Sequence, residues 1–149
     1  MKNIFLLISL LVIISSAFSQ SRPQKKIRKT FEQHAPQAED VKWSGEGDNR
    51  YKDWTANYTV GADSLQTKYD SKANWLFTLK YITLDQLPKE VTASILDKYQ
   101  GAVLTKAAEM QEPDFDGYGV AFIYQKDRWA VAITKEENVF RRQITSEGF

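Results

Sequence analysis

The sequence predicts an α+β fold made of two tandem units. Each unit is a helix followed by a four-stranded antiparallel sheet, and the two sheets can join into one curved surface. Displacing the chain by 64 residues aligns apolar positions with apolar positions without a gap. Each copy opens with an apolar stripe of helical period and continues with segments that alternate between apolar and polar residues.

The two helices are predicted from apolar residues spaced four apart. The first stripe is Ile27, Phe31 and Ala35, and the second is Val91, Ile95 and Tyr99. Pro36 ends the first helix because proline cannot continue it. Pro88 suits the first turn of the second helix, and Gly101 follows as its stop.

Eight strands are expected from the alternation. We place them near 39–46, 51–60, 64–70 and 74–82 in the first unit, and near 103–111, 117–125, 128–134 and 138–145 in the second. In the second strand, Trp54, Ala56, Tyr58 and Val60 alternate with Thr55, Asn57 and Thr59. Successive side chains of a strand point to opposite faces, so the first set is expected to face the helix.

The N-terminus is typical of a secretory signal peptide. Lys2 precedes an apolar run from Ile4 to Ile14, and cleavage is expected between Ser19 and Gln20. The run is too short for a membrane anchor, since it reaches only about half of a hydrocarbon core of roughly 30 Å. We therefore divide the chain into a signal peptide (1–19), a first unit (20–82) and a second unit (83–149) that form one compact body. The protein is expected in the periplasm of a Gram-negative bacterium or outside the cell.

Composition excludes several function classes. The chain has no cysteine, which removes disulfides, thiolate nucleophiles and cysteine-based zinc sites. Without Lys2 the mature chain has 19 basic and 19 acidic residues. Nucleic-acid binders have a clear basic excess, so nucleic acid is not an expected partner. The zero net charge also disfavours a purely electrostatic role at a membrane surface.

No catalytic or metal-binding motif stands out, and we expect neither an enzyme nor a cofactor. The single histidine, His34, aligns with Lys98 and lies at the flank of the first helix. Glu112, Asp114 and Asp116 faintly resemble a calcium loop, but the ligand spacing and the closing glutamate are missing. These acids are therefore interpreted as a solvated turn.

The stretch "NWLFTLKYI" places an apolar row on one side of the fourth strand, namely Trp75, Phe77, Leu79 and Tyr81. The 64-residue shift pairs this row with Val139, Arg141, Gln143 and Thr145. Arginine and glutamine are almost never placed in a dry core. The row is therefore expected on the open face of the sheet, away from the helix. The alternative is that the second unit, or the linker "TLDQLP", covers it.

The residues also resemble a known family. "FEQHAPQAEDVKW", "YKDWTANYTV", "YDSKANWLFT" and "LPKEVTASILDKYQGA" are similar to PepSY-like, β-lactamase-inhibitor-like (BLIP-like) proteins that Gram-negative bacteria export. His34 stands where that pattern has tyrosine, and Asn74 stands where glycine is common. The resemblance covers the whole mature chain. It implies two helix-plus-four-strand repeats and a function in binding a protein or peptide, including inhibition of an enzyme.

The sequence thus favours an exported, non-enzymatic binding module. A protein or peptide would dock on the open face of the sheet. The expected contact residues are Trp75, Phe77, Tyr81, Thr55, Asn57 and Lys68. Aromatic side chains are common anchors in interfaces, and polar neighbours surround them. One alternative function is a carrier for a small ligand or lipid, which would need a pocket between helix and sheet. Another is an envelope or stress-related structural protein with no single ligand.

Overall fold

The computed structural model describes residues 22–48 and 52–135, and the backbone of 140–144. Its elements follow the expected order. The first unit holds α1 (Lys25–His34), β1 (Glu39–Glu46), β2 (Asp53–Val60), β3 (Asp63–Tyr69) and β4 (Trp75–Ile82). A 3₁₀ turn, η1 (Leu84–Gln86), leads to the second unit, which holds α2 (Lys89–Lys98), β5 (Val103–Glu112), β6 (Phe115–Tyr124), β7 (Asp127–Thr134) and β8 (Phe140–Ile144). The predicted α+β fold is confirmed, and every strand lies within two residues of its expected bounds.

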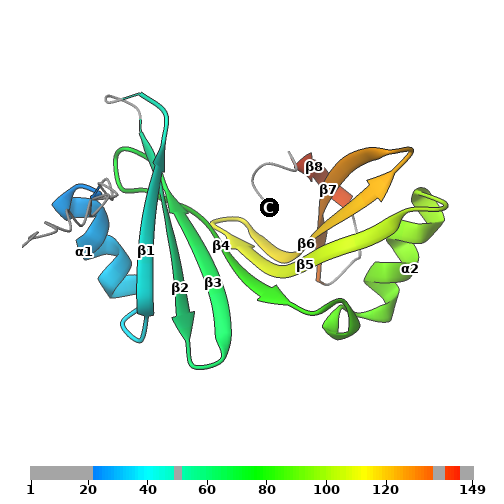
Figure 1. Ribbon diagram of the computed structural model, residues 1–149, viewed down its shortest axis with the longest axis horizontal. Coiled ribbons are helices and arrows are strands. Elements are labelled where there is room, and N and C mark those ends of the chain that lie inside the picture. Colours follow the sequence, from blue (N-terminus) through cyan, green and yellow to red (C-terminus); the bar gives the residue numbers. More distant parts are fainter. Residues whose placement is uncertain (1–21, 49–51, 136–139, 145–149) are drawn as a thin grey trace, which may run out of the picture.

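The eight strands form one antiparallel sheet in the order β1-β2-β3-β4-β5-β6-β7-β8. The two units meet where β4 pairs with β5, for example through Leu79 and Met110. Figure 1 shows that the sheet curves strongly, with α1 and α2 outside the curve at opposite ends of the molecule. We call the face that packs on the helices the outer face, and the opposite face the inner face.

Both helices pack and end in the same way, 64 residues apart. Ile27 and Phe31 of α1 are buried, and so are Val91 and Ile95 of α2. The amide of Ala35 donates to the carbonyl of Phe31 at the end of α1, at 2.8 Å. The corresponding bond at the end of α2 joins Tyr99 to Ile95, also at 2.8 Å. The apolar stripe, rather than a side-chain cap, thus positions each helix on its sheet.

The core under α1 is mainly aromatic. It contains Ile27, Phe31, Trp54, Ala56, Tyr58, Tyr69 and Ala73, with Trp43 and Trp75 packed against it. The ring of Phe31 meets Trp43 and Tyr58 edge to face, with centroids 5.2 and 5.0 Å apart. The expected alternation in β2 is confirmed here, because Trp54, Ala56 and Tyr58 all face this core.

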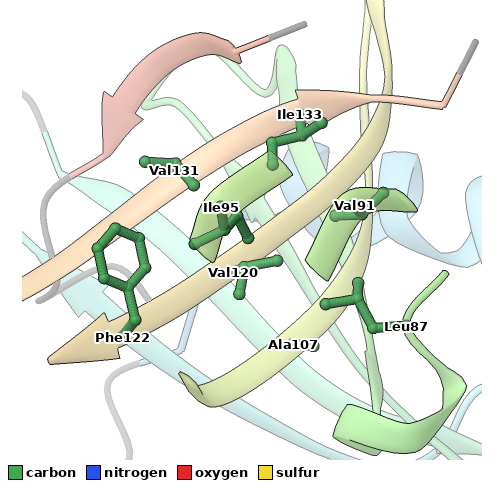
Figure 2. Packing of buried hydrophobic residues seen from close by; sticks show 8 residues of the cluster. All are labelled: Leu87, Val91, Ile95, Ala107, Val120, Phe122, Val131 and Ile133. Atoms are coloured by element: carbon green, nitrogen blue, oxygen red, sulfur yellow. The ribbon is translucent and has the colours of Figure 1, made fainter. Parts of the chain in front are cut away.

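The core under α2 is mainly aliphatic. Figure 2 shows Leu87, Val91, Ile95, Ala107, Val120, Phe122, Val131 and Ile133 converging between α2 and strands β5, β6 and β7. Most of its aromatic side chains gather at one end, where the Tyr99 and Phe122 centroids lie 4.8 Å apart. The two units therefore fill the same framework with different side chains.

A third cluster lies on the inner face, where the two units join. Its buried members are Leu79, Ala108, Met110, Phe115 and Ala132, and the half-buried Phe77 and Tyr81 pack against them. No helix contributes to this cluster. Phe77, Leu79 and Tyr81 therefore lie on the face away from the helices, as the sequence predicts for them. The row is partly covered, however, since Leu79 is only 1% exposed.

Trp75 is the exception to the predicted row. Tyr69 pairs with Trp75 while Lys68 pairs with Phe77, so Leu76 is an extra residue in β4. One extra residue in a strand reverses which face the following side chains occupy. Trp75 thus belongs to the first core, with its ring 6.2 Å from that of His34. The prediction that Trp75 lies on the open face is wrong, because it assumed unbroken alternation.

The last strand departs from the 64-residue shift. Ile133 pairs with Phe140 and Ala132 pairs with Arg142. Six residues separate Ile133 from its partner Phe140, whereas five separate Tyr69 from its partner Trp75, so β8 follows β4 with a shift of 65. By register, Arg142 takes the position of Phe77, where the sequence comparison had placed Arg141. The prediction of the open face thus compared the residues of β4 with the wrong residues of β8. Its conclusion that Phe77, Leu79 and Tyr81 face away from the helices is nevertheless correct.

The expected signal peptide (1–19) lies outside the described residues. The side chains of Val139, Arg141, Gln143 and Thr145 also lie outside them. Within the described part of the chain, no helix has the length and apolar character needed to cross a membrane.

Candidate functional site

The structure brings five of the six predicted contact residues to the inner face. Thr55 pairs with Lys68, and Lys68 pairs with Phe77 on the next strand. Directly paired residues share a face of the sheet, so this row crosses β2, β3 and β4. Asn57 pairs with Gln66 in the same way, next to Leu79. Only Trp75 is absent, for the reason given above.

Not all five side chains are accessible. Thr55 is 8% exposed and therefore offers little surface to a partner. Asn57 is exposed, whereas Gln66, Lys68, Phe77 and Tyr81 are half-buried. We call Asn57, Gln66, Lys68, Phe77 and Tyr81 the inner-face patch. It joins two aromatic rings to two amides and one ammonium group, which is a composition typical of binding surfaces.

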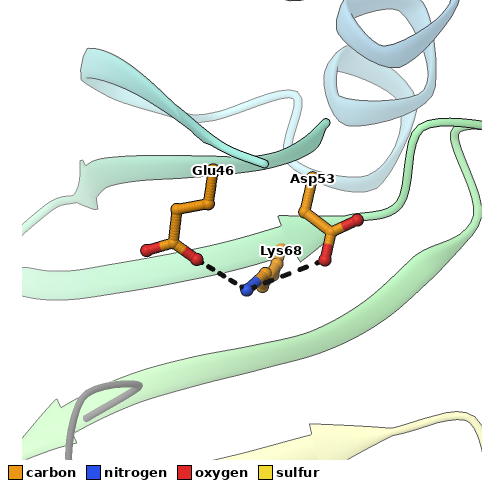
Figure 3. Close-up of polar contacts among 3 residues, drawn as sticks. All are labelled: Glu46, Asp53 and Lys68. Atoms are coloured by element: carbon orange, nitrogen blue, oxygen red, sulfur yellow. Dashed lines mark hydrogen bonds and ion pairs between the residues drawn. The ribbon is translucent and has the colours of Figure 1, made fainter. Parts of the chain in front are cut away.

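Lys68 is held by two carboxylates of neighbouring strands. Figure 3 shows its ammonium group between Glu46 of β1 and Asp53 of β2, with N–O distances of 3.0 and 3.8 Å. The side chain of Glu46 is largely exposed, so this triad contributes little to stability. Its effect is to fix the position of the ammonium group at the edge of the patch.

Tyr81 is oriented by contacts from both units. Its hydroxyl donates to Oε1 of Gln66 at 3.0 Å. The ammonium group of Lys106, from β5, lies 4.6 Å from the centre of its ring. Burial raises the pKa of the Tyr81 hydroxyl, so this group stays a neutral hydrogen-bond donor at physiological pH. The patch is therefore preorganised by hydrogen bonding and not by packing alone.

Sequence reasoning missed the part of the inner face that belongs to the second unit. Val103 and Ile123 are directly paired on β5 and β6, and they are 62% and 41% exposed. A depression of about 270 Å³ lies beside them and is lined in part by Lys106 and Arg128. The sequence does carry a signal for this surface, because Val103 and Ile123 alternate with the helix-facing Leu104 and Phe122 and must point to the opposite face.

The other candidate residues have structural partners. Nδ1 of His34 and the hydroxyl of Tyr69 lie 3.2 Å apart. Burial raises the pKa of Tyr69, and the neighbouring Tyr58 raises it further. In the turn suspected of calcium binding, Asp116 forms an ion pair with Lys135 at 3.0 Å. Among the described residues, no three acids, histidines or cysteines gather in a way that could hold a metal ion.

A second depression lies between α1 and the edge strand β1. Its volume is about 420 Å³, within the range of small-molecule sites. Its apolar lining comes from Phe31, Ala35, Pro36, Ala38, Val41 and Trp43, and its charged lining from Arg28 and Glu32. This is the place between helix and sheet that a carrier would need.

No protein-family profile matches the chain, and neither does any curated protein sequence. Solved structures do match. A DUF2874 family protein from Bacteroides ovatus superposes with a TM-score of 0.65 at 18% identity, over 83% of this chain and 87% of that one. A BLIP-like protein from Bacteroides fragilis superposes with a TM-score of 0.64 at 19% identity, over 83% and 86%. A protein from Bacteroides eggerthii, provisionally described as periplasmic, gives 0.64 at 16% identity, over 83% and 88%.

These identities are too low to transfer an activity or a partner, so they establish the architecture alone. The BLIP-like part of the sequence resemblance is confirmed at the level of fold. The α+β chain with two helices on one antiparallel sheet has the fold of the BLIP-like and DUF2874 proteins of Bacteroides.

Proposed function

We propose that the protein is an exported, non-enzymatic binding module, and that a folded protein or an extended peptide docks on its inner-face patch. The observation that carries this proposal is the patch itself. Phe77 and Tyr81 are half-buried on the inner face, and the exposed Asn57 and the fixed ammonium group of Lys68 border them. If the partner is an enzyme whose cleft the patch covers, docking inhibits it.

The rigidity of the patch supports binding to a partner of defined shape. Its residues lie on the adjacent strands β2, β3 and β4, and each of these strands is paired on both sides. A surface that is already ordered loses little conformational entropy on binding. The BLIP-like and periplasmic descriptions of structural neighbours are consistent with export and with binding.

Site-specific photo-crosslinking tests the proposal. A photoreactive residue is placed at Asn57 in the patch, or at Ala93 on the exposed side of α2, and the protein is exported in its native host. We expect one defined protein adduct from Asn57 and none from Ala93. Both positions are exposed, so neither replacement disturbs a core.

The affinity for the identified partner is then measured with two blocking variants. Asn57→Arg adds bulk and charge to the patch and should weaken binding at least tenfold. Ala93→Arg adds the same side chain to the outer side of the molecule and should leave the affinity unchanged. Adducts from Ala93 but not from Asn57, or equal affinities for the two variants, would overturn the proposal.

The depression between α1 and β1 supports a second candidate function, a carrier of a small amphipathic ligand. Trp43 lines this depression, so its fluorescence reports on occupancy. Saturable quenching by a long-chain fatty acid, lost in Ala38→Trp, would favour the carrier. Binding of the protein partner at the inner-face patch would not be affected by that substitution.

A further inference from the structure

The exposed side of α1, together with Arg22 just before it, is strongly basic. Five basic residues occur within eight positions, all of them exposed: Arg22, Lys25, Lys26, Arg28 and Lys29. We propose that this basic face docks the protein electrostatically on an anionic phospholipid bilayer. The proposal is independent of the inner-face patch.

The zero net charge of the mature chain conceals a separation of charge. Residues 22–34 contain five basic residues and one acidic residue, Glu32, whereas residues 35–149 contain 14 basic and 18 acidic residues. The net positive charge is thus concentrated on α1 and Arg22, and α1 lies at one end of the molecule (Figure 1). A local field of one sign attracts an oppositely charged surface even when the whole protein is neutral.

The five cations are available to a ligand. In the part of the chain that the structure describes, none of them forms an ion pair, whereas Lys68, Lys80 and Lys135 all do. The other helix provides an internal control. At the positions of Lys26, Arg28 and Lys29, α2 has Glu90, Thr92 and Ala93. The basic face is therefore a property of α1 and not of the fold.

The contact would be electrostatic without insertion into the bilayer. Ile27 and Phe31 form the apolar side of α1, and they are 0% and 4% exposed in the first core. They cannot enter a membrane unless the helix leaves its sheet. The basic side chains meet the headgroups while α1 stays folded on β1–β3. Binding of this kind is reversible and is weakened by salt.

A bilayer fits this surface better than an anion of defined shape. The five cations are exposed, and the depression beside α1 contains only Arg28 of the five. A field that is broad and lacks a pocket suits a surface whose charged groups can move laterally. The expected export brings α1 to the envelope, where anionic lipids supply such a surface.

Vesicle sedimentation tests the proposal with the exported, processed protein. The vesicles contain phosphatidylcholine alone or with phosphatidylglycerol at three parts in ten. We expect binding to the anionic vesicles in 50 mM salt, loss of binding in 500 mM salt, and no binding to neutral vesicles. Lys26→Gln with Lys29→Gln should weaken binding on the order of 25-fold, since each cation near an anionic surface contributes about fivefold.

The matched control removes the same charge elsewhere. Lys89→Gln with Lys126→Gln changes two exposed lysines of the second unit and should weaken binding by less than about threefold. Circular dichroism establishes that both double variants are folded. Equal losses in the two pairs, binding to neutral vesicles, or binding to heparin or DNA with none to the anionic vesicles would overturn the proposal.

Discussion

The inner faces of the two units share one backbone pattern but have opposite chemistry. In the first unit strands β1, β2 and β3 carry polar residues on this face, namely Ser44, Glu46, Asp53, Thr55, Asn57, Gln66 and Lys68. In the second unit the residues 64 positions later are Ala108, Met110, Gly117, Gly119, Ala121, Ala130 and Ala132. These positions also pair in the same register. The fold therefore does not dictate what its inner face carries.

The small residues of the second unit explain the third cluster. Alanine and glycine have small side chains or none, so they leave space above the inner face of β5, β6 and β7. Phe77, Leu79 and Tyr81 of β4 pack into this space. Ala108 and Ala132 are 0% and 1% exposed beneath this layer. The inner face of the second unit thus forms part of an additional core, whereas strands β1 to β3 of the first unit present polar residues beside it. This division is why we place the docking site in the first unit.

The largest expected effect comes from exchanging the two chemistries at one pair of positions. Ala132→Lys places the side chain of Lys68 at the equivalent site in the second unit. An ammonium group buried there lacks the two carboxylate partners that Lys68 has, because Met110 and Gly117 occupy the positions of Glu46 and Asp53. We expect a loss of about 4 kcal/mol or more in the free energy of unfolding. Urea denaturation measures the loss.

The reverse exchange serves as the control. Lys68→Ala removes a half-buried lysine whose nearer partner, Glu46, is largely exposed, and it should cost less than about 1 kcal/mol. Similar costs for the two substitutions would show that the inner faces do not differ as described.

Gly117 gives the next largest effect. A Cβ atom at this position would collide with the carbonyl oxygen of Ile133 and with the ring of Phe115. The third cluster therefore has no space for a side chain at residue 117. We expect Gly117→Ala to cost roughly 2–3 kcal/mol, as overpacking does. Asp53→Ala, at the equivalent position of the first unit, should cost less than about 1 kcal/mol. Thermal unfolding of the two variants under identical conditions compares them.

The outer faces offer a comparison of intermediate size. The hydroxyl of Thr67 lies 3.1 Å from that of Tyr58 and 2.9 Å from that of Thr78, within the first core. Val131 occupies the equivalent place in the aliphatic second core. Thr67→Val leaves buried hydroxyl groups short of partners, and Val131→Thr buries a hydroxyl among aliphatic side chains. Each should cost roughly 1–3 kcal/mol in chemical denaturation, and a stabilising effect of either would contradict the contrast.

The smallest effect concerns alkaline pH. Burial raises the folded-state pKa of Tyr69 above the value of about 10 of an unfolded tyrosine. The neutral hydroxyl is favoured in the folded state, so its stabilisation is fully present below about pH 10 and is lost as the pH rises further. Tyr69→Phe should cost about 1 kcal/mol at pH 7, since its contact with His34 is lost. Denaturation curves should show that the difference in the free energy of unfolding between Tyr69→Phe and the wild type narrows above pH 10. A difference that widens would contradict the raised pKa of Tyr69.

Much of the fold follows from sequence periodicity, and the errors have local causes. The helix stripes and the alternation of Trp54, Ala56 and Tyr58 predicted the outer face correctly, because these strands are regular. The extra residue at Leu76 reversed the face of Trp75, and nothing in the composition of β4 announces a bulge. One more residue between the paired positions Ile133 and Phe140 than between Tyr69 and Trp75 moved the register of β8 by one residue. Neither irregularity can be read from the pattern of apolar positions alone.

The candidate site was predicted in part. Asn57, Lys68, Phe77 and Tyr81 could be assigned to one face by parity, and the structure places them there. The burial of Thr55 and Leu79 could not be predicted, because it depends on how the two units curve around the third cluster. The basic face of α1 cannot be predicted from the net charge, because the acidic excess of residues 35–149 cancels it.

Hydroxyl-radical footprinting with and without the cross-linked partner tests the central claim most directly, because it reports side-chain accessibility over the whole surface at once. We expect the partner to lower the labelling of Phe77 and Tyr81 and to leave Leu96 and Ile123 unchanged, since the latter two lie on α2 and on the second unit's inner face. Unaltered labelling of Phe77 and Tyr81, together with protection of Leu96, would contradict docking on the polar inner face of the first unit.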